Sequence, residues 1–109
     1  MPFDEDVAER VRRHLATLDG IEEKRMFGGL AFMLHGNMCV GVNKDELMVR
    51  VGPDAYEKAL ALKHARPMDF TGKPLKGYVF VGPQGFARDS ALQSWIARGV
   101  AFTATLKPK

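Results

Sequence analysis

The chain has 109 residues, a single cysteine and a formal net charge of +3, with 46% hydrophobic and 27% charged residues. This length and composition indicate one globular domain over residues 1–109 and exclude an intrinsically disordered chain. One cysteine excludes an intrachain disulfide, and neither a secretory signal nor an apolar run of ~20 residues is present, so we expect a cytoplasmic protein that makes no membrane contact.

The first predicted element is a helix whose apolar positions recur at helical spacing, at Val7, Val11, Leu15 and Leu18. Asp4 is placed to cap its N-terminus, and the turn residues 19–20 end it. The acidic residues 4–6 favour the positive end of the helix dipole over a metal site, because adjacent side chains point in different directions.

From Arg25 the apolar period becomes two, which predicts a three-stranded meander with turns at residues 36–37 and 43–45. One face of this meander is fully apolar and consists of Leu30, Phe32, Leu34, Met38, Val40, Val42, Leu47, Val49 and Val51. The second face carries smaller or adaptable side chains, namely Ala31, Met33, Cys39, Gly41 and Met48. Because helices can cover only one face well, we interpret this second face as a surface for self-association.

The second half of the chain predicts a helix, two strands and a final helix. The helix opens at Pro53 and ends at residues 65–67. Residues 68–70 form a short extended piece, residues 71–74 a turn and residues 77–81 a strand. The last helix starts near Asp89, and we expect its Trp95 to pack onto the sheet, with Gly99 leaving room for the strand backbone. The predicted fold is α+β, with an antiparallel sheet and the order α-β-β-β-α-β-β-α.

Two adjacent glycines, Gly28 and Gly29, invite comparison with a phosphate-binding loop. They match neither GxxxxGK[ST] nor GxGxxG, and a strand follows them where a phosphate site needs a helix N-terminus. We interpret them as a bend or bulge in the first strand, or as a point of close backbone approach.

A catalytic or metal site finds little support in the sequence. Cys39 and His35 could be cross-strand neighbours, but a nucleophilic thiol needs a lowered pKa and an oriented base, and no third residue orients this pair. His14, His35 and His64 lie on different elements without ligand spacing. We therefore expect no catalytic residue, no metal and no cofactor. A small Cys/His enzyme is a weaker hypothesis than an interaction module or a nucleic-acid-binding domain.

The later half of the chain is distinctly basic. Residues 1–54 hold seven Lys or Arg against ten Asp or Glu, whereas residues 55–109 hold nine against three. Five of the basic positions could converge at one edge: Lys63, His64, Arg66, Lys73 and Lys76. Such a cluster could bind nucleic-acid phosphates or acidic side chains. Nucleic-acid binding is the alternative here, and an ordinary solvated surface is favoured, because the neighbouring aromatics Phe70 and Tyr78 are expected in the core.

Four segments carry a resemblance to a known family: KRMFGGLAFMLHGNMCVGV, DELMVRVG, ARPMDFTGKPLKGYVFV and LQSWI. Over nearly its whole length the chain resembles the TfoX N-terminal domain family, named for the TfoX/Sxy regulators of bacterial competence. The resemblance implies an α+β domain similar to secretion-chaperone-like folds, often dimeric and without catalytic residues. The regulators' second, helical domain has no counterpart in these residues, so we expect a standalone N-terminal domain.

Together these inferences predict a non-enzymatic regulatory or protein-interaction module that acts as a homodimer. The resemblance links it to competence or transcription regulation, and the sequence does not identify its protein partner.

Overall fold

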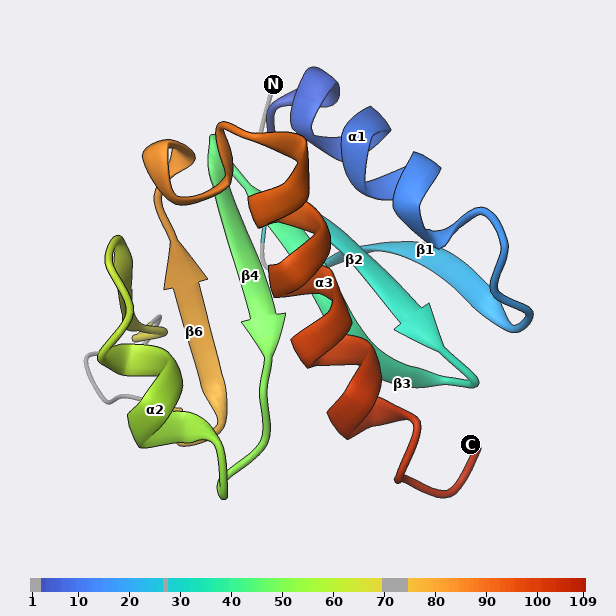
Figure 1. The fold of residues 1–109 in the computed structure, drawn as a ribbon. Helices are drawn as coiled ribbons and strands as arrows, with labels where there is room; N and C mark the ends of the chain where they lie inside the picture. The colour runs from blue at the N-terminus through green and yellow to red at the C-terminus, as the bar shows by residue number, and fades with distance from the viewer. Residues whose placement is uncertain (1–2, 27, 70–74) are drawn as a thin grey trace.

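The structure is a computed structural model that describes residues 3–26, 28–69 and 75–109 (Figure 1). Within these residues the elements are α1 (Glu5–Leu15), β1 (Ile21–Met26), β2 (Gly29–Leu34), β3 (Asn37–Asn43), β4 (Glu46–Arg50), α2 (Tyr56–Leu60), β5 (Ala65–Pro67), β6 (Tyr78–Val81), the 3₁₀ turn η1 (Pro83–Phe86) and α3 (Asp89–Thr103). The α+β class is confirmed. The predicted elements occur in the predicted order, and β1 is an additional strand ahead of them in the meander.

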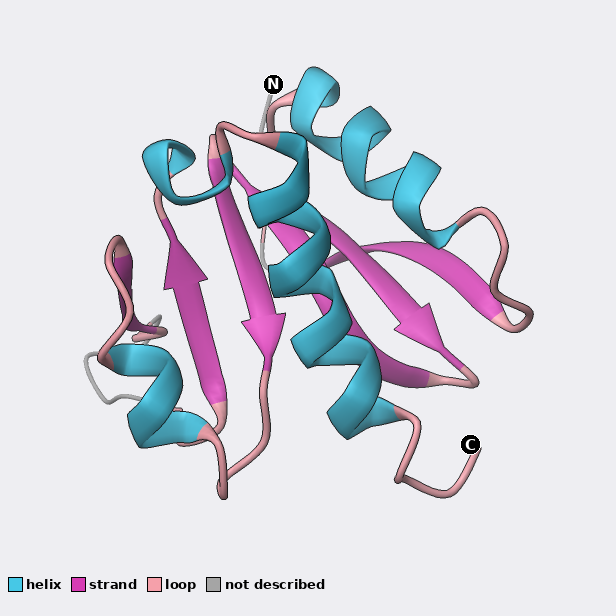
Figure 2. Ribbon diagram, viewed as in Figure 1, coloured by secondary structure: helices cyan, strands magenta, loops and turns pink. Residues whose placement is uncertain are grey.

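The described strands form one antiparallel sheet in the order β1-β2-β3-β4-β6-β5. The helices cover one face of it, and α3 crosses β3 and β4 (Figures 1 and 2). The main core fills the space between these two layers. None of the described helices has both the length and the apolar character needed to cross a membrane.

Helix α1 begins where the sequence predicted. The Asp4 carboxylate accepts hydrogen bonds from the backbone N–H groups of Asp6 (2.8 Å) and Val7 (3.2 Å), which satisfies donors that the first helical turn leaves free. Its buried residues, Val7, Ala8, Val11 and Leu15, face the core. Leu18, the last residue of the predicted apolar stripe, lies beyond the helix and is 37% exposed. The prediction was therefore wrong for this residue.

The glycine pair lies at a hairpin and not at a bend within one strand. Gly28 sits between β1 and β2 with a φ of +74°, a conformation that glycine adopts without strain. Gly29 opens β2, where an added Cβ would lie 2.3 Å from the carbonyl oxygen of Val42, so close backbone approach is confirmed at this position. The meander therefore has four strands.

A bulge in β3 changes which side chains face the helices. Phe32 pairs with Val40 but Met33 pairs with Met38, so two residues on β3 oppose one on β2. Cys39 consequently joins the main core with 0% exposure, while Met38 packs on the opposite face. The predicted faces of Cys39 and Met38 were both wrong, because strict alternation fails across a bulge.

The second helix is much shorter than predicted. Helix α2 ends at Leu60, and residues 61–64 form turns in which His64 has a φ of +71°. Residues 65–67, predicted to end this helix, instead form β5 and pair with β6. Of the predicted extended piece, Met68 is buried on the second face, whereas Phe70 and the turn at 71–74 lie outside the described residues.

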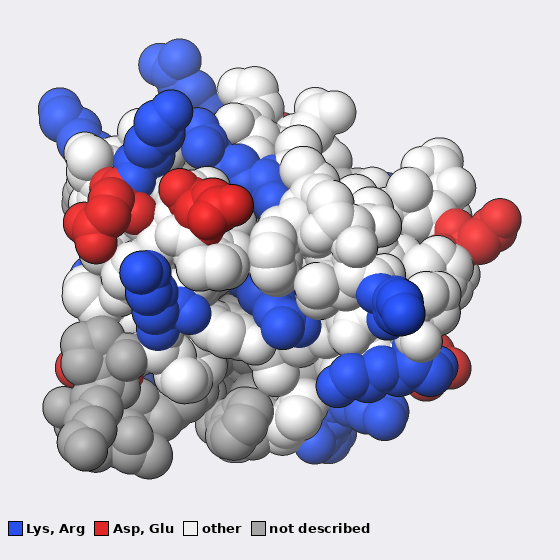
Figure 3. All heavy atoms as spheres, turned by 90° about the horizontal axis from the view of Figure 1, so that it is seen from below, with Lys and Arg blue, Asp and Glu red and all other residues white. Residues whose placement is uncertain are grey.

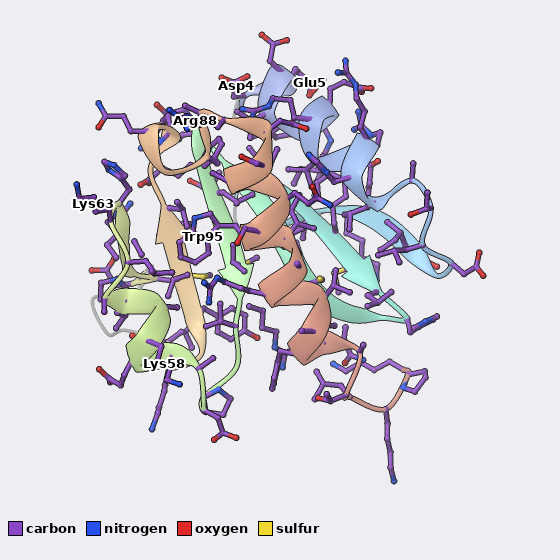
Figure 4. The ribbon with its side chains drawn as sticks, in the orientation of Figure 1. Asp4, Glu5, Lys58, Lys63, Arg88 and Trp95 are labelled. Atoms are coloured by element: carbon purple, nitrogen blue, oxygen red, sulfur yellow. The ribbon has the colours of Figure 1, made fainter. Side chains whose placement is uncertain are left out.

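Helix α3 runs unbroken through Gly99. An added Cβ at this position would lie 2.9 Å from Cγ1 of Val40 and 3.0 Å from the carbonyl oxygen of Cys39, so glycine lets the helix approach the strand as expected. Trp95 is 6% exposed within the main core, which confirms its predicted place between helix and sheet (Figure 4).

Candidate functional site

The predicted basic cluster is divided between the two ends of β6. Lys63 and His64 lie in the turn before β5, level with the end of β6, because the His64 carbonyl accepts a 3.0 Å hydrogen bond from the backbone N–H of Gly82. Lys76 precedes β6 and lies at its other end. The four residues of β6 span about 13 Å at ~3.3 Å per residue. Lys73 lies outside the described residues, so the described members do not form one compact patch.

Arg66 is engaged by two carboxylates. Its Nε donates to Oε2 of Glu46 at 3.1 Å, its Nη2 donates to Oε1 of the same carboxylate, and its Nη1 lies 3.7 Å from Asp69. The guanidinium also stacks on the Phe80 ring, 4.8 Å from its centroid. These contacts neutralise its charge and hold it against the sheet. Seen from below, Lys and Arg side chains form separate groups, with carboxylates among those on the left (Figure 3).

The predicted self-association face is largely buried within the single chain. Ala31 is 4% exposed, Met33 8% and Met48 5%. Met48 packs with Met68 and Phe80, and Gly41 is buried where an added Cβ would lie 2.9 Å from a β2 carbonyl oxygen. A cavity of about 20 Å³ remains on this face, room for about one water molecule. Cys39 does not belong to this face.

Cys39 and His35 occupy different environments. Burial raises the pKa of the Cys39 thiol, an effect that a hydrogen bond from Thr103 and the charge of Arg50 only partly oppose. A nucleophilic cysteine needs the opposite shift. His35 is exposed at the β2–β3 turn with a φ of +50°.

The other histidines serve the scaffold or lie at the surface. His14 is 16% exposed, and its Nε2 lies 3.1 Å from the Asp89 carboxylate, which ties α1 to the start of α3. His64 lines an open hollow of about 370 Å³ with Gly82, Pro83 and Gln84. Within the described ranges, no three His, Cys, Asp or Glu side chains come together as a group that could hold a metal ion.

Strand β1 is an exposed sheet edge that the sequence pattern did not predict. Its four central residues, 22–25, are all charged and exposed, so no apolar alternation marks the strand. Arg12 of α1 donates to both carboxylate oxygens of Glu23, at 2.6 and 2.8 Å. These hydrogen bonds, with the charge of Arg12, lower the pKa of Glu23. The hydrogen bonds to Glu23 and to Glu9 raise the pKa of Arg12. The signal that could have found β1 is its position, because its six residues lie between the turn at residues 19–20 and Gly28.

The family model of the TfoX N-terminal domain matches residues 13–103, most of the 109-residue chain. The chain belongs to the TfoX N-terminal domain family. Searches of the curated proteins and of the solved structures found no significant match. The TfoX N-terminal match begins within α1 and includes every described strand, and therefore the β1 edge and both parts of the divided basic cluster.

The last residues of this TfoX N-terminal domain chain, beyond the matched range, return to the β2–β3 hairpin. The buried Asn37 side chain donates to the Lys107 carbonyl at 2.9 Å, and the backbone N–H of Lys109 donates to the His35 carbonyl at 2.8 Å. The sequence indicated Asn37 only as a turn residue.

Proposed function

We propose that this chain is a non-enzymatic regulatory module that acts by binding other proteins, in competence or transcription regulation, and that it works as a homodimer. The family match over residues 13–103 carries the proposal. Its place in the TfoX N-terminal domain family supports a role in regulation over one in catalysis.

The chemistry of the described side chains supports a binding role. Cys39 is buried with a raised pKa, His14 faces Asp89, and Arg66 faces Glu46. Each of these groups stabilises the fold through a contact within the chain, and none is poised as a nucleophile or base.

A gene-deletion experiment tests the regulatory role. In the organism that encodes the chain, deletion is expected to change natural transformation frequency or the transcript level of DNA-uptake genes, and the wild-type gene is expected to restore both. A Cys39→Ala allele should restore them equally, because the proposal gives this thiol no chemical role. Unchanged phenotypes in the deletion strain would refute the regulatory role, and failure of the Cys39→Ala allele at normal protein levels would favour the enzyme hypothesis.

Nucleic-acid binding is the alternative, supported by the exposed cations Lys63 and Lys76. Fluorescence anisotropy with a labelled duplex and a labelled single strand at low salt separates the two functions. We expect no binding. Affinity that falls steeply with salt, and that disappears when Lys63, Arg66 and Lys76 are replaced by alanine, would overturn the proposal in favour of this alternative.

A further inference from the structure

We propose that two copies of this chain associate through their β1 strands, which pair antiparallel about a two-fold axis at Glu23 and join the two sheets into one. The inference rests on the homodimer of the proposed function and names its interface.

The backbone of β1 is suited to receive another strand. Its six residues pair with β2 in an uninterrupted register from Ile21↔Leu34 to Met26↔Gly29. Along its outer side the described chain places no strand, and the described turns, loops and caps make no backbone hydrogen bond to residues 22–26. The opposite edge, β5, has only three residues and ends in Pro67, which lacks a backbone donor. Of the two edges, β1 therefore offers the longer and more regular template.

The side chains of β1 divide between the two faces of the sheet. Ile21 packs against the main core, Glu23 bonds to Arg12 of α1, and Arg25 stacks over the Phe3 ring at 5.5 Å, so these odd-numbered residues face the helices. Glu22 and Lys24 alternate with them onto the other face. Both are exposed, and the described residues give neither an ion pair.

Two-fold symmetry makes these charges self-complementary. In an antiparallel pair of identical strands, the residue on the axis lies opposite its own copy, and residues equally far on either side lie opposite each other. With Glu23 on the axis, Glu22 of each copy lies opposite Lys24 of the other, which gives two reciprocal ion pairs. The two Glu23 carboxylates that meet at the axis are each already compensated by Arg12. An axis at Lys24 would instead oppose two ammonium groups that have no such compensation.

Apolar surface continues the edge. A hollow of about 260 Å³ lies between the end of α1 and the sheet, lined by Arg12, Leu15, Ala16, Leu18, Ile21 and Phe32. Ile21 belongs to β1, and Leu18 is among the exposed large hydrophobic residues.

Charged residues on an edge strand also serve to prevent pairing. That is the competing explanation, and it does not require opposite signs at positions that symmetry brings together.

Charge exchange tests the interface. Glu22→Lys and Lys24→Glu each replace both ion pairs by like-charge pairs, so by analytical ultracentrifugation each single variant is expected to dimerise about tenfold more weakly than wild type or worse. An equimolar mixture of the two variants is expected to form heterodimers, and the double variant to recover wild-type dimerisation. The controls are Glu57→Lys and Lys58→Glu, which make the same charge changes at exposed positions on α2 (Figure 4 labels Lys58), and circular dichroism verifies the fold of every variant.

The outcomes separate this inference from the proposed homodimer. Wild type that dimerises, with single variants that dimerise equally well or a mixture that does not recover, would refute the β1 interface and leave the homodimer standing. A wild-type chain that stays monomeric at high concentration would refute both.

Discussion

Replacing Trp95 by alanine is expected to destabilise the domain severely. The residue is 6% exposed in the main core, and the guanidinium of Arg98 lies 5.5 Å from its ring centroid. Burial of about 200 Å² by the indole corresponds to about 5 kcal/mol at ~25 cal/mol per Å². Truncations of this kind cost about 3–5 kcal/mol. Since a domain of this size has roughly 5–15 kcal/mol of unfolding free energy, the variant should lose about a fifth of it or more.

Urea unfolding followed by far-ultraviolet circular dichroism measures this loss without depending on tryptophan fluorescence. Trp95→Phe keeps an aromatic ring in the core and is expected to cost less. Arg98→Ala removes only the cation–π contact and should cost below about 1 kcal/mol. If Trp95→Ala unfolded at the wild-type urea concentration yet lost self-association or a protein partner, Trp95 would be an interface anchor and the core assignment would be wrong.

Three further predictions concern single positions. Gly29→Ala is expected to lower the free energy of unfolding by about 1–3 kcal/mol, because the new Cβ would lie 2.3 Å from a β3 carbonyl oxygen. In the control Gly82→Ala the new Cβ meets nothing within 4 Å, so this variant should unfold at the wild-type urea concentration. Equal urea midpoints for the two variants would contradict this reasoning. Because Arg12 lowers the pKa of Glu23, the stability from this pair is present above the ordinary carboxyl pKa and is lost as the pH falls through the lower folded value. Glu23→Gln should therefore cost less than about 1 kcal/mol at neutral pH and nothing in strong acid, and a thermal-melting difference that persists in acid would argue against it. Iodoacetamide should alkylate the buried Cys39 of the folded chain at least about 100-fold more slowly than a free thiol. Once urea unfolds the chain, Cys39 should react at the rate of a free thiol. Rapid alkylation of the native chain would show that the thiol is accessible.

Local signals predicted the parts of the fold that depend on neighbours in the chain. The Asp4 cap needs only the next few backbone amides, and the turn at residues 43–45 needs only residues that tolerate it. The apolar spacing of α3 also identified Trp95 as a core residue, because helical periodicity is a property of the sequence itself.

The candidate interface depended on pairing that local signals do not carry. Strand β1 is held by β2 along one edge and by Arg12 of α1 over one face, so its charged residues need no apolar alternation to form a strand. Edge strands lack a second neighbour and can be exposed on both faces, which removes the period-two pattern.

Composition and local patterns were enough for the α+β class, the order of the predicted elements, the cap of α1 and the core faces of α1 and α3. Three features depended on contacts between distant segments: the bulge that turns Cys39 into the core, the pairing of residues 65–67 as β5, and the neutralisation of Arg66 by Glu46, twenty positions earlier. The physical reason is that caps, turns and helical periodicity act over a few residues, whereas register, bulges and ion pairs between strands exist only after distant segments meet.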